Sequence, residues 1–235
     1  MHRRTALALS ALAVPAVLLP ATAAAAAPGG GNGNGNSKAH AAHDTGHSSD
    51  KGNGNGTQVY RSTLMELNDS GATGKVMLRL RGDELTIRIK AEGLLPNAVH
   101  AQHIHGEGNR ECPPMSAAGA DGVLNVLEGA PFYGPIVTSL TVTGDTSPAA
   151  GLSVEIMPVA DDKGRIDYRR TITLPEDVSN DLEDYQIVQH GVDLNGSGGY
   201  DAGPGESEIA PGVPLEVTVP ANCGTIDHVG HDHSH

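Results

Sequence analysis

The sequence predicts an all-β domain over about residues 57 to 226, built as an antiparallel Greek-key β-sandwich or flattened barrel. Short runs of Val, Ile and Leu recur through this region, and Gly, Pro, Asn and Asp separate them as turn residues do. Several runs alternate apolar and polar side chains, which is the pattern of a half-buried strand. About eight short strands with turn signals between them are typical of this architecture. Because the chain has no Trp and one Phe, its core must be aliphatic.

The first strands are expected at residues 59 to 67, 75 to 81 and 85 to 89. The second strand alternates cleanly, with Val76, Leu78 and Leu80 on one face and mostly basic residues on the other. Gly82-Asp83 then forms a turn, and the apolar positions resume at every second residue from Leu85 to Ile89. The second and third runs therefore predict a β-hairpin.

A further strand is expected at residues 99 to 105, followed by a long irregular loop from Gly106 to Gly134 that contains Cys112. Loops of this length in compact domains tend to be functional or pinned. The remaining elements are one short helical turn within residues 175 to 184 and strands at residues 136–143, 153–159, 166–174, 185–190 and 215–219.

The first 27 residues have the pattern of a secretory signal peptide. A basic start is followed by an apolar core from Ala6 to Leu19 and then by small residues. The core is short and is interrupted by Pro15 and Pro20, so it does not predict a membrane span. We therefore expect a secreted, extracellular protein without a membrane-spanning segment.

Low-complexity segments flank the expected domain. Residues 28–56 consist largely of Gly, Asn, Ser and His, and residues 227–235 form a His-rich tail. Neither segment holds enough large apolar side chains to offset the entropy of ordering, so both are predicted to be disordered. Such tracts bind Cu²⁺, Ni²⁺ or Zn²⁺ loosely, or simply remain solvated.

The composition is strongly acidic. The chain has 15 basic and 28 acidic residues, a formal net charge of −13, and loss of Arg3 and Arg4 with the signal would take it to −15. A net negative charge disfavours nucleic acid and anionic membranes as partners.

The chain has two cysteines, Cys112 and Cys223. In an exported protein two cysteines favour one disulfide, with two unpaired thiols as the alternative. The bridge would close a loop of 112 residues, which the chain-entropy model values at about 4 to 5 kcal/mol of stabilisation.

The most informative motif is His100-Ala-Gln-His103-Ile-His105-Gly106. Residues two apart in a strand point to the same face, so His103 and His105 can bind one metal ion together. His100, Gln102 and Ile104 share the other face, where a buried Gln102 would need a hydrogen-bond partner.

These residues, with a late histidine and two cysteines, resemble the copper/zinc superoxide dismutases. The matching features are the His-x-x-His-x-His strand, Cys112 soon after it, His190 at the end of an apolar run before a Gly-rich stretch, and Cys223 near the end. The resemblance implies an antiparallel Greek-key fold, a disulfide, and copper bound by His103, His105 and His190.

The resemblance also implies roles around the site. His100 matches a buried framework histidine, and Asp193 is a candidate acceptor that would orient a ligand ring. If copper cycles there, the three histidines are also the catalytic residues and superoxide is the substrate.

Several features of that family are missing. No histidine lies between Gly106 and Gln189, so the bridging histidine, the fourth copper ligand and the separate zinc subsite are absent. Residues 219–226 lack the arginine that attracts superoxide in the family. Three neutral imidazoles suit copper but would also accept zinc.

Two alternatives to an enzyme remain open at this point. His103, His105 and His190 could form a hydrogen-bonded structural cluster, because the His-Ile-His-Gly strand and the later segment from Gly134 to Leu140 also resemble the CHRD domain, an extracellular β module without assigned chemistry. The protein could equally sequester copper without turnover.

One other motif follows His190. Asp193, Asn195 and Ser197 resemble the opening of a calcium loop, but Pro204 replaces the glutamate expected at the twelfth position. We interpret this segment as a turn.

Overall fold

The computed structural model describes residues 56–230. These residues belong to the second of two units, Gly52–His235. The predicted signal peptide, all but the last residue of the linker, and residues 231–235 lie outside the described residues, as do His40, His43 and His47. No helix in the described part is long and apolar enough to cross a membrane.

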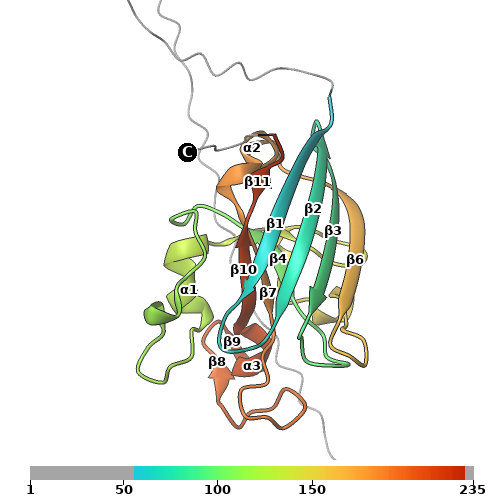
Figure 1. Ribbon diagram of the computed structural model, residues 1–235. Coiled ribbons are helices and arrows are strands. Elements are labelled where there is room, and N and C mark those ends of the chain that lie inside the picture. Colours follow the sequence, from blue (N-terminus) through green and yellow to red (C-terminus); the bar gives the residue numbers. More distant parts are fainter. Residues whose placement is uncertain (1–55, 231–235) are drawn as a thin grey trace, which may run out of the picture. The chain divides into compact units, whose positions relative to one another are not determined.

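The prediction of an all-β, antiparallel fold is confirmed. Eight strands form one curled sheet in the order β5-β4-β7-β10-β1-β2-β3-β6, and the short β11 (Asp227–His228) pairs with β1 (Figure 1). The order is not sequential, so the chain crosses over between β3 and β4 and again between β6 and β7, as in Greek-key barrels. The bounds are β1 Gln58–Glu66, β2 Thr73–Arg81, β3 Glu84–Glu92, β4 Gln102–His105, β5 Ile136–Ser139, β6 Ile166–Thr173, β7 Gln186–His190 and β10 Pro220–Thr225.

Strands β1, β2, β3 and β6 form a regular antiparallel half of the sheet. The predicted hairpin is confirmed, because β2 and β3 pair in an unbroken register from Thr73 opposite Glu92 to Arg81 opposite Glu84. In β2 and β3 the inward side chains are aliphatic and buried, whereas the outward ones, apart from Met77, are charged or polar. The sequence alternation therefore decided which face covers the main core.

The other half of the sheet, β5-β4-β7-β10, has short strands that are buried on both faces. Ile104 and Ile187 point into the main core, while Val188 and Cys223 belong to a second, smaller core. The second core contains Leu67, Leu124 and Tyr133, which come from the end of β1 and from the segment after β4. This segment covers the outer face of β4 and β7.

The two ends of the sheet, β5 and β6, are not hydrogen-bonded to each other as strands in the described region. Side chains of β6 connect them instead. The Tyr168 hydroxyl and the Arg170 guanidinium both donate to the carbonyl of Thr141, at 3.0 and 2.8 Å, just after β5. The barrel is therefore closed by side-chain bonds on this side.

Three segments differ from the sequence prediction. The expected loop from Gly106 to Gly134 contains the helix α1 (Val126–Tyr133), which begins with a capping box between Asn125 and Glu128. The strand expected at residues 153–159 is instead a 3₁₀ turn at Val154–Ile156, and the strand expected at 215–219 is the short helix α3 (Leu215–Thr218).

Pro214 marks the last difference. It ends β9 and is the N-cap of α3, with φ at −53°, and the next strand of the sheet begins only at Pro220. This strand, β10, lies between β7 and β1 and was not predicted. Its Gly224 is required by close approach, because a Cβ there would collide with the Ser62 hydroxyl and the Thr63 carbonyl of β1.

Other predicted boundaries shift by a few residues. Regular pairing starts at Gln102 rather than at 99, although Val99 forms an isolated bridge with Val159. The strand expected at 136–143 ends at Ser139. The short strand β11 (Asp227–His228) lies in the segment that the sequence predicts to be a disordered tail.

The fold also contains several short elements. The helical turn expected within 175–184 is confirmed as α2 (Glu176–Asn180) and a 3₁₀ turn at Leu182–Asp184. The remaining elements are 3₁₀ turns at Met115–Ala117 and Pro148–Ala150 and a two-stranded ribbon of β8 (Glu206–Ser207) and β9 (Ala210–Pro214).

The disulfide between Cys112 and Cys223 is confirmed, with an S–S distance of 2.00 Å and a Cα–Cα distance of 5.7 Å. It ties the segment after β4 to the buried strand β10. Because Cys223 is in the second core, the bridge pins the covering segment directly over the outer face of the sheet.

Candidate metal centre

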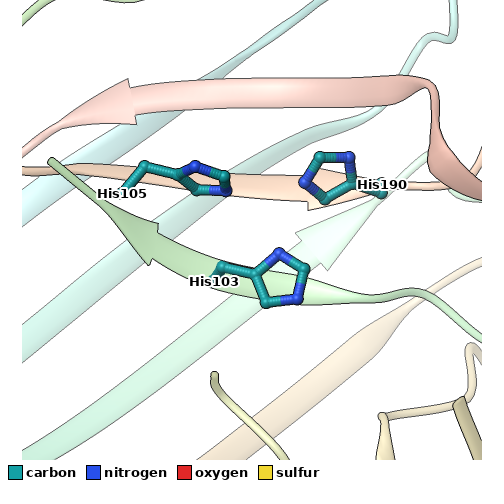
Figure 2. A group of neighbouring side chains, drawn as sticks. All are labelled: His103, His105 and His190. Carbon is teal, nitrogen blue, oxygen red and sulfur yellow. The ribbon is translucent and has the colours of Figure 1, made fainter. Parts of the chain in front are cut away.

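Three histidines from two neighbouring strands meet on the outer face of the sheet (Figure 2). His103 and His105 lie on one face of β4, as the alternation predicts. β7 pairs with β4 antiparallel, placing Val188 opposite His103 and Gln186 opposite His105. His190 shares the parity of Gln186 and Val188, so its ring comes to the same face.

The three rings form a compact triangle. Their centroids are 5.5 Å apart for His103 and His105, 5.2 Å for His103 and His190, and 5.8 Å for His105 and His190. One nitrogen of each ring lies within 4.8 Å of the corresponding nitrogen of the other two. This group could hold a metal ion, and imidazole nitrogens bind metals such as zinc at about 2 Å.

Backbone carbonyls hold the other nitrogen of each ring. His103 Nε2 lies 3.0 Å from the Gly151 carbonyl, His105 Nδ1 lies 2.9 Å from that of Gly134, and His190 Nδ1 lies 2.7 Å from that of Thr218. A carbonyl only accepts, so each of these nitrogens carries the hydrogen. The lone pairs are then left on His103 Nδ1, His105 Nε2 and His190 Nε2.

Those three lone-pair nitrogens are buried and have no hydrogen-bond partner among the described residues. Buried polar atoms in native proteins almost always have a partner, and leaving one without costs about 1 to 3 kcal/mol. Three such atoms directed toward one point fit a metal ion that completes the set. The ligand set and its fixed ring orientations therefore agree with metal binding.

Burial keeps the three rings neutral. It lowers the pKa of His105 from 6.5 to about 3, with repulsion from His190 adding to the effect, and lowers the pKa of His190 to about 4. The pKa of His103 is also well below 6.5, through burial and then through repulsion by His190 and His105. Neutral imidazole is the form that binds metal, so the site is ready to bind at neutral pH without releasing protons.

The carbonyl partners come from three separate covering segments. Gly134 ends α1 with φ at 76°, a conformation that favours glycine, and a Cβ there would collide with the Gly106 carbonyl. Gly151 follows the 3₁₀ turn at Pro148–Ala150, and Thr218 is the last residue of α3. The covering segments thus orient the rings as well as shield them.

Tyr133 adds an apolar wall to the site. It is fully buried, and its ring packs against that of His105 with centroids 4.6 Å apart. With the disulfide and Leu124 it makes the second core, which lies beside the histidine group. The three histidines are accordingly at most 4 % exposed.

His100 is buried but does not join the group. Its Nδ1 lies 2.9 Å from the carbonyl of His190, its Nε2 lies 3.1 Å from that of Leu95, and the ring also contacts the Tyr200 hydroxyl. His100 thus helps to position the backbone of His190, but its ring is not one of the three that could hold the metal ion.

Asp193 does not have the predicted role of orienting a ligand ring. Its carboxylate accepts hydrogen bonds from the backbone N–H groups of Gly196, Ser197 and Gly198 at 2.8 to 3.1 Å. It therefore holds the turn expected after His190. Backbone carbonyls, which sequence patterns do not reveal, orient the ligand rings instead.

Gln102 has the buried partner that it was predicted to need. Its Nε2 donates to the Leu140 carbonyl at 2.9 Å, and its Oε1 accepts from Gln189 at 3.1 Å, which in turn accepts from Asn222 at 2.8 Å. These amides form a chain across β4, β7 and β10 on the face opposite the histidines. The chain fixes the register that brings His190 beside His103.

The sequence reasoning missed two residues near the site. Tyr133 had a detectable signal, because Asn125 and Glu128 form an N-terminal capping pattern that starts its helix. Glu216, buried in α3, accepts from the backbone N–H groups of Leu194 and Asp201 and so holds the loop after β7. No local pattern distinguishes Glu216 from a surface glutamate.

Fold and site together define an all-β protein with a buried group of three histidines that can hold a metal ion. No protein-family model matches the chain, and no curated protein matches it.

Proposed function

We propose that this protein is an exported, superoxide dismutase-like copper-binding protein that holds one copper ion through His103, His105 and His190. The observation that carries the proposal is the convergence of three buried nitrogens without partners, each on a ring oriented by a backbone carbonyl. Imidazole nitrogens suit copper, and copper binds such sites most tightly among the divalent first-row metals.

The chain itself would contribute a dry, rigid and uncharged pocket. The depressed pKa values keep the ligands free of protons well below neutral pH, which favours retention of the ion. Burial and the carbonyl partners fix the rings, so little freedom is lost on binding. These features favour tight retention over loose exchange.

Metal analysis of the protein expressed through its own secretion route tests the proposal. We expect one copper per chain after dialysis against a weak chelator, and we expect His190→Ala to lose it. The fall in affinity should exceed the roughly 10- to 100-fold that the loss of a group behind a ligand costs. The matched control, His231→Ala with His233→Ala and His235→Ala, removes three imidazoles from the tail and should leave the retained copper unchanged.

Retention of copper by the His190→Ala protein with unchanged affinity would exclude the proposed centre. Retention of zinc in place of copper would keep the site but change its metal. The dialysis accounts for the other histidine-rich segment, residues 28–56, since loosely bound metal there would pass to the chelator.

A second candidate function is superoxide disproportionation at the same site. It is favoured by the family resemblance and by the ligand count, because three protein ligands leave a position of the ion for a small molecule. Bound copper would supply a one-electron couple, so that two superoxide ions and two protons give one O₂ and one H₂O₂. The buried ligands and the lack of arginine in residues 219–226 predict a rate well below that of the family.

Superoxide decay, measured with the copper-loaded protein and with His190→Ala, distinguishes the two functions. Loss of activity in the variant would support turnover at the three-histidine centre. Activity that survives in the variant would rule out His190 as a redox ligand. A wild-type protein that retains copper without activity would be a copper-sequestering or CHRD-like module.

A further inference from the structure

The outward face of β1, β2, β3 and β6 carries an excess of basic side chains, although the chain as a whole is acidic. Among residues 56–230, seven of the eleven lysines and arginines lie on this face, against three acidic residues. We call it the basic face; its basic members are Arg61, Lys75, Arg79, Arg81, Arg88, Lys90 and Arg169, and its acidic members are Glu84, Glu92 and Asp167.

The strand register places like charges directly opposite one another. Lys75 pairs with Lys90 across β2 and β3, and Arg88 pairs with Arg169 across β3 and β6. The same register also pairs opposite charges, Arg81 with Glu84 and Lys90 with Asp167. The two like-charge pairs are unfavourable for the sheet, because like charges in directly opposite positions destabilise it.

Few of these charges are neutralised within the protein. Asp167 forms ion pairs with Arg88 at 2.7 Å and with Lys90 at 3.7 Å. In the described residues, no acidic partner contacts Arg61, Arg79, Arg81 or Arg169, and the Lys75 ammonium donates only to the Thr63 hydroxyl. The basic face therefore presents unpaired donors to the solvent.

A shallow hollow lies at the centre of the basic face. Its volume is about 390 Å³, and it is lined by Met77, Arg79, Thr86, Arg88 and Arg169. The guanidinium groups present planar, two-pronged donors, which match the oxygens of carboxylate, sulfate or phosphate groups. Thr86, whose hydroxyl lies 2.9 Å from that of Thr171, adds a neutral donor.

We propose that the basic face binds an anionic polysaccharide, whose repeating acidic groups lie between the opposed basic pairs and in the hollow. Charge complementarity supports this partner, and a regular sheet presents its cations at steps of about 4.8 Å across strands and about 6.7 Å along them. Figure 1 shows the four strands side by side on a part of the sheet that α1 does not cover.

Other polyanions fit the basic face less well. Single-stranded nucleic acid needs aromatic side chains on which bases can stack, and the outward positions of these strands hold none. A membrane surface would require several exposed apolar side chains that insert, but only Met65 and Met77 are exposed large apolar residues at the outward positions of these strands. The predicted export of the chain places it among extracellular glycans.

Binding of the full mature chain to dextran sulfate, compared with uncharged dextran, tests the proposal by calorimetry. The measurement belongs near pH 8, where ordinary histidines with a pKa of about 6.5 are neutral and the His-rich ends carry no charge. We expect binding to the sulfated polymer alone, with an affinity that falls as salt rises.

Two variants of equal charge change locate the binding surface. Arg79→Glu with Arg169→Glu alters the hollow and should weaken binding at least 10-fold, with a shallower salt dependence. Arg110→Glu with Lys163→Glu makes the same change elsewhere in the described chain and should change affinity less than 2-fold. Circular dichroism and copper retention verify that both variants are folded.

Equal losses in the two variants would overturn the proposal, because net charge rather than the basic face would then govern binding. Binding to uncharged dextran would also overturn it. Tighter binding to DNA of equal charge, or a wild-type dimer in sedimentation that the hollow variant abolishes, would assign the basic face to another occupant. Each of these outcomes leaves the copper centre unaffected, so the two proposals fail separately.

Discussion

The position of one hydrogen on each imidazole determines what the histidine group can bind. His103 is held through Nε2 and so presents Nδ1, whereas His105 and His190 are held through Nδ1 and present Nε2. Rotation of any ring by a half-turn would place a hydrogen at the shared point and leave a carbonyl without its donor. For metal binding, the carbonyls of Gly134, Gly151 and Thr218 are therefore as necessary as the three histidines.

Lowering the pH should destabilise the metal-free protein through these residues. Unfolded histidines have a pKa of about 6.5, whereas the folded pKa is about 3 for His105 and about 4 for His190. Between these values the unfolded state binds more protons, so the free energy of unfolding falls as the pH falls from about 6.5 toward 4. The slope approaches at most about 1.4 kcal/mol per pH unit for each histidine.

Urea unfolding of the metal-free protein at a series of pH values measures this slope. His105→Gln with His190→Gln removes two titrating groups and should give a visibly shallower dependence over the same range. An unchanged slope in this variant would mean that other groups, such as the carboxylates, cause the acid sensitivity.

At the scale of the elements, the regular and irregular strands differ in how much their sequences reveal. In β2 and β3 one face is solvated, so the alternation of apolar and charged residues predicted both the strands and the hairpin. β10 is buried on both faces, so its sequence does not alternate between apolar and polar residues. It also begins with Pro220 and is not enriched in β-branched residues, so its composition does not indicate a strand. The face shared by His103 and His105 was predictable from the sequence, but β10, the strand that pairs with β7, was not.

The opposed arginines of β3 and β6 should cost stability. Arg169 lies directly opposite Arg88, so Arg169→Glu replaces a repulsive pair by an attractive one. We expect the free energy of unfolding to rise by about 0.2 to 1 kcal/mol at low salt, and the gain to shrink at high salt. Urea unfolding at two salt concentrations measures both effects.

Arg169→Ala serves as the intermediate case, because it removes the repulsion without adding an attraction. A fall in stability for the glutamate variant would show that Arg169 has an internal role. If Arg169→Glu raises the free energy of unfolding and also weakens dextran sulfate binding, then Arg169 contributes to binding and lowers stability.

At the scale of the whole molecule, one disulfide ties the segment after β4 to the sheet. It joins Cys112, in the segment that covers the histidines, to Cys223, in the middle of the sheet. The sequence separation of 111 residues places it among the long-loop bridges, which constrain the unfolded chain most.

Cys112→Ala with Cys223→Ala should lower the free energy of unfolding by about 2 to 5 kcal/mol. Because the covering segment supplies the Gly134 carbonyl to His105, the proposed copper ion should also leave the variant faster than the wild type. Urea unfolding and competition with a copper chelator measure the two effects. Unchanged stability would contradict a structural role for the bridge.

The sequence by itself determined the all-β class, the hairpin, the pairing of the two cysteines and the two histidines on one face, because these depend on short-range alternation and on residue type. His190 was assigned by family resemblance, and its proximity to the other two depends on the pairing of β4 with β7, which are far apart in the chain.

Only the tertiary structure decided where the third ring lies, which nitrogen of each ring is free, and that basic residues gather on one side of an acidic protein. The physical reason is that strand order and carbonyl positions come from long-range packing, whereas residue patterns report only the local period and face. Asp193 is an example. It was predicted to orient a ligand ring, but its carboxylate accepts hydrogen bonds within the turn after His190, and backbone carbonyls orient the rings.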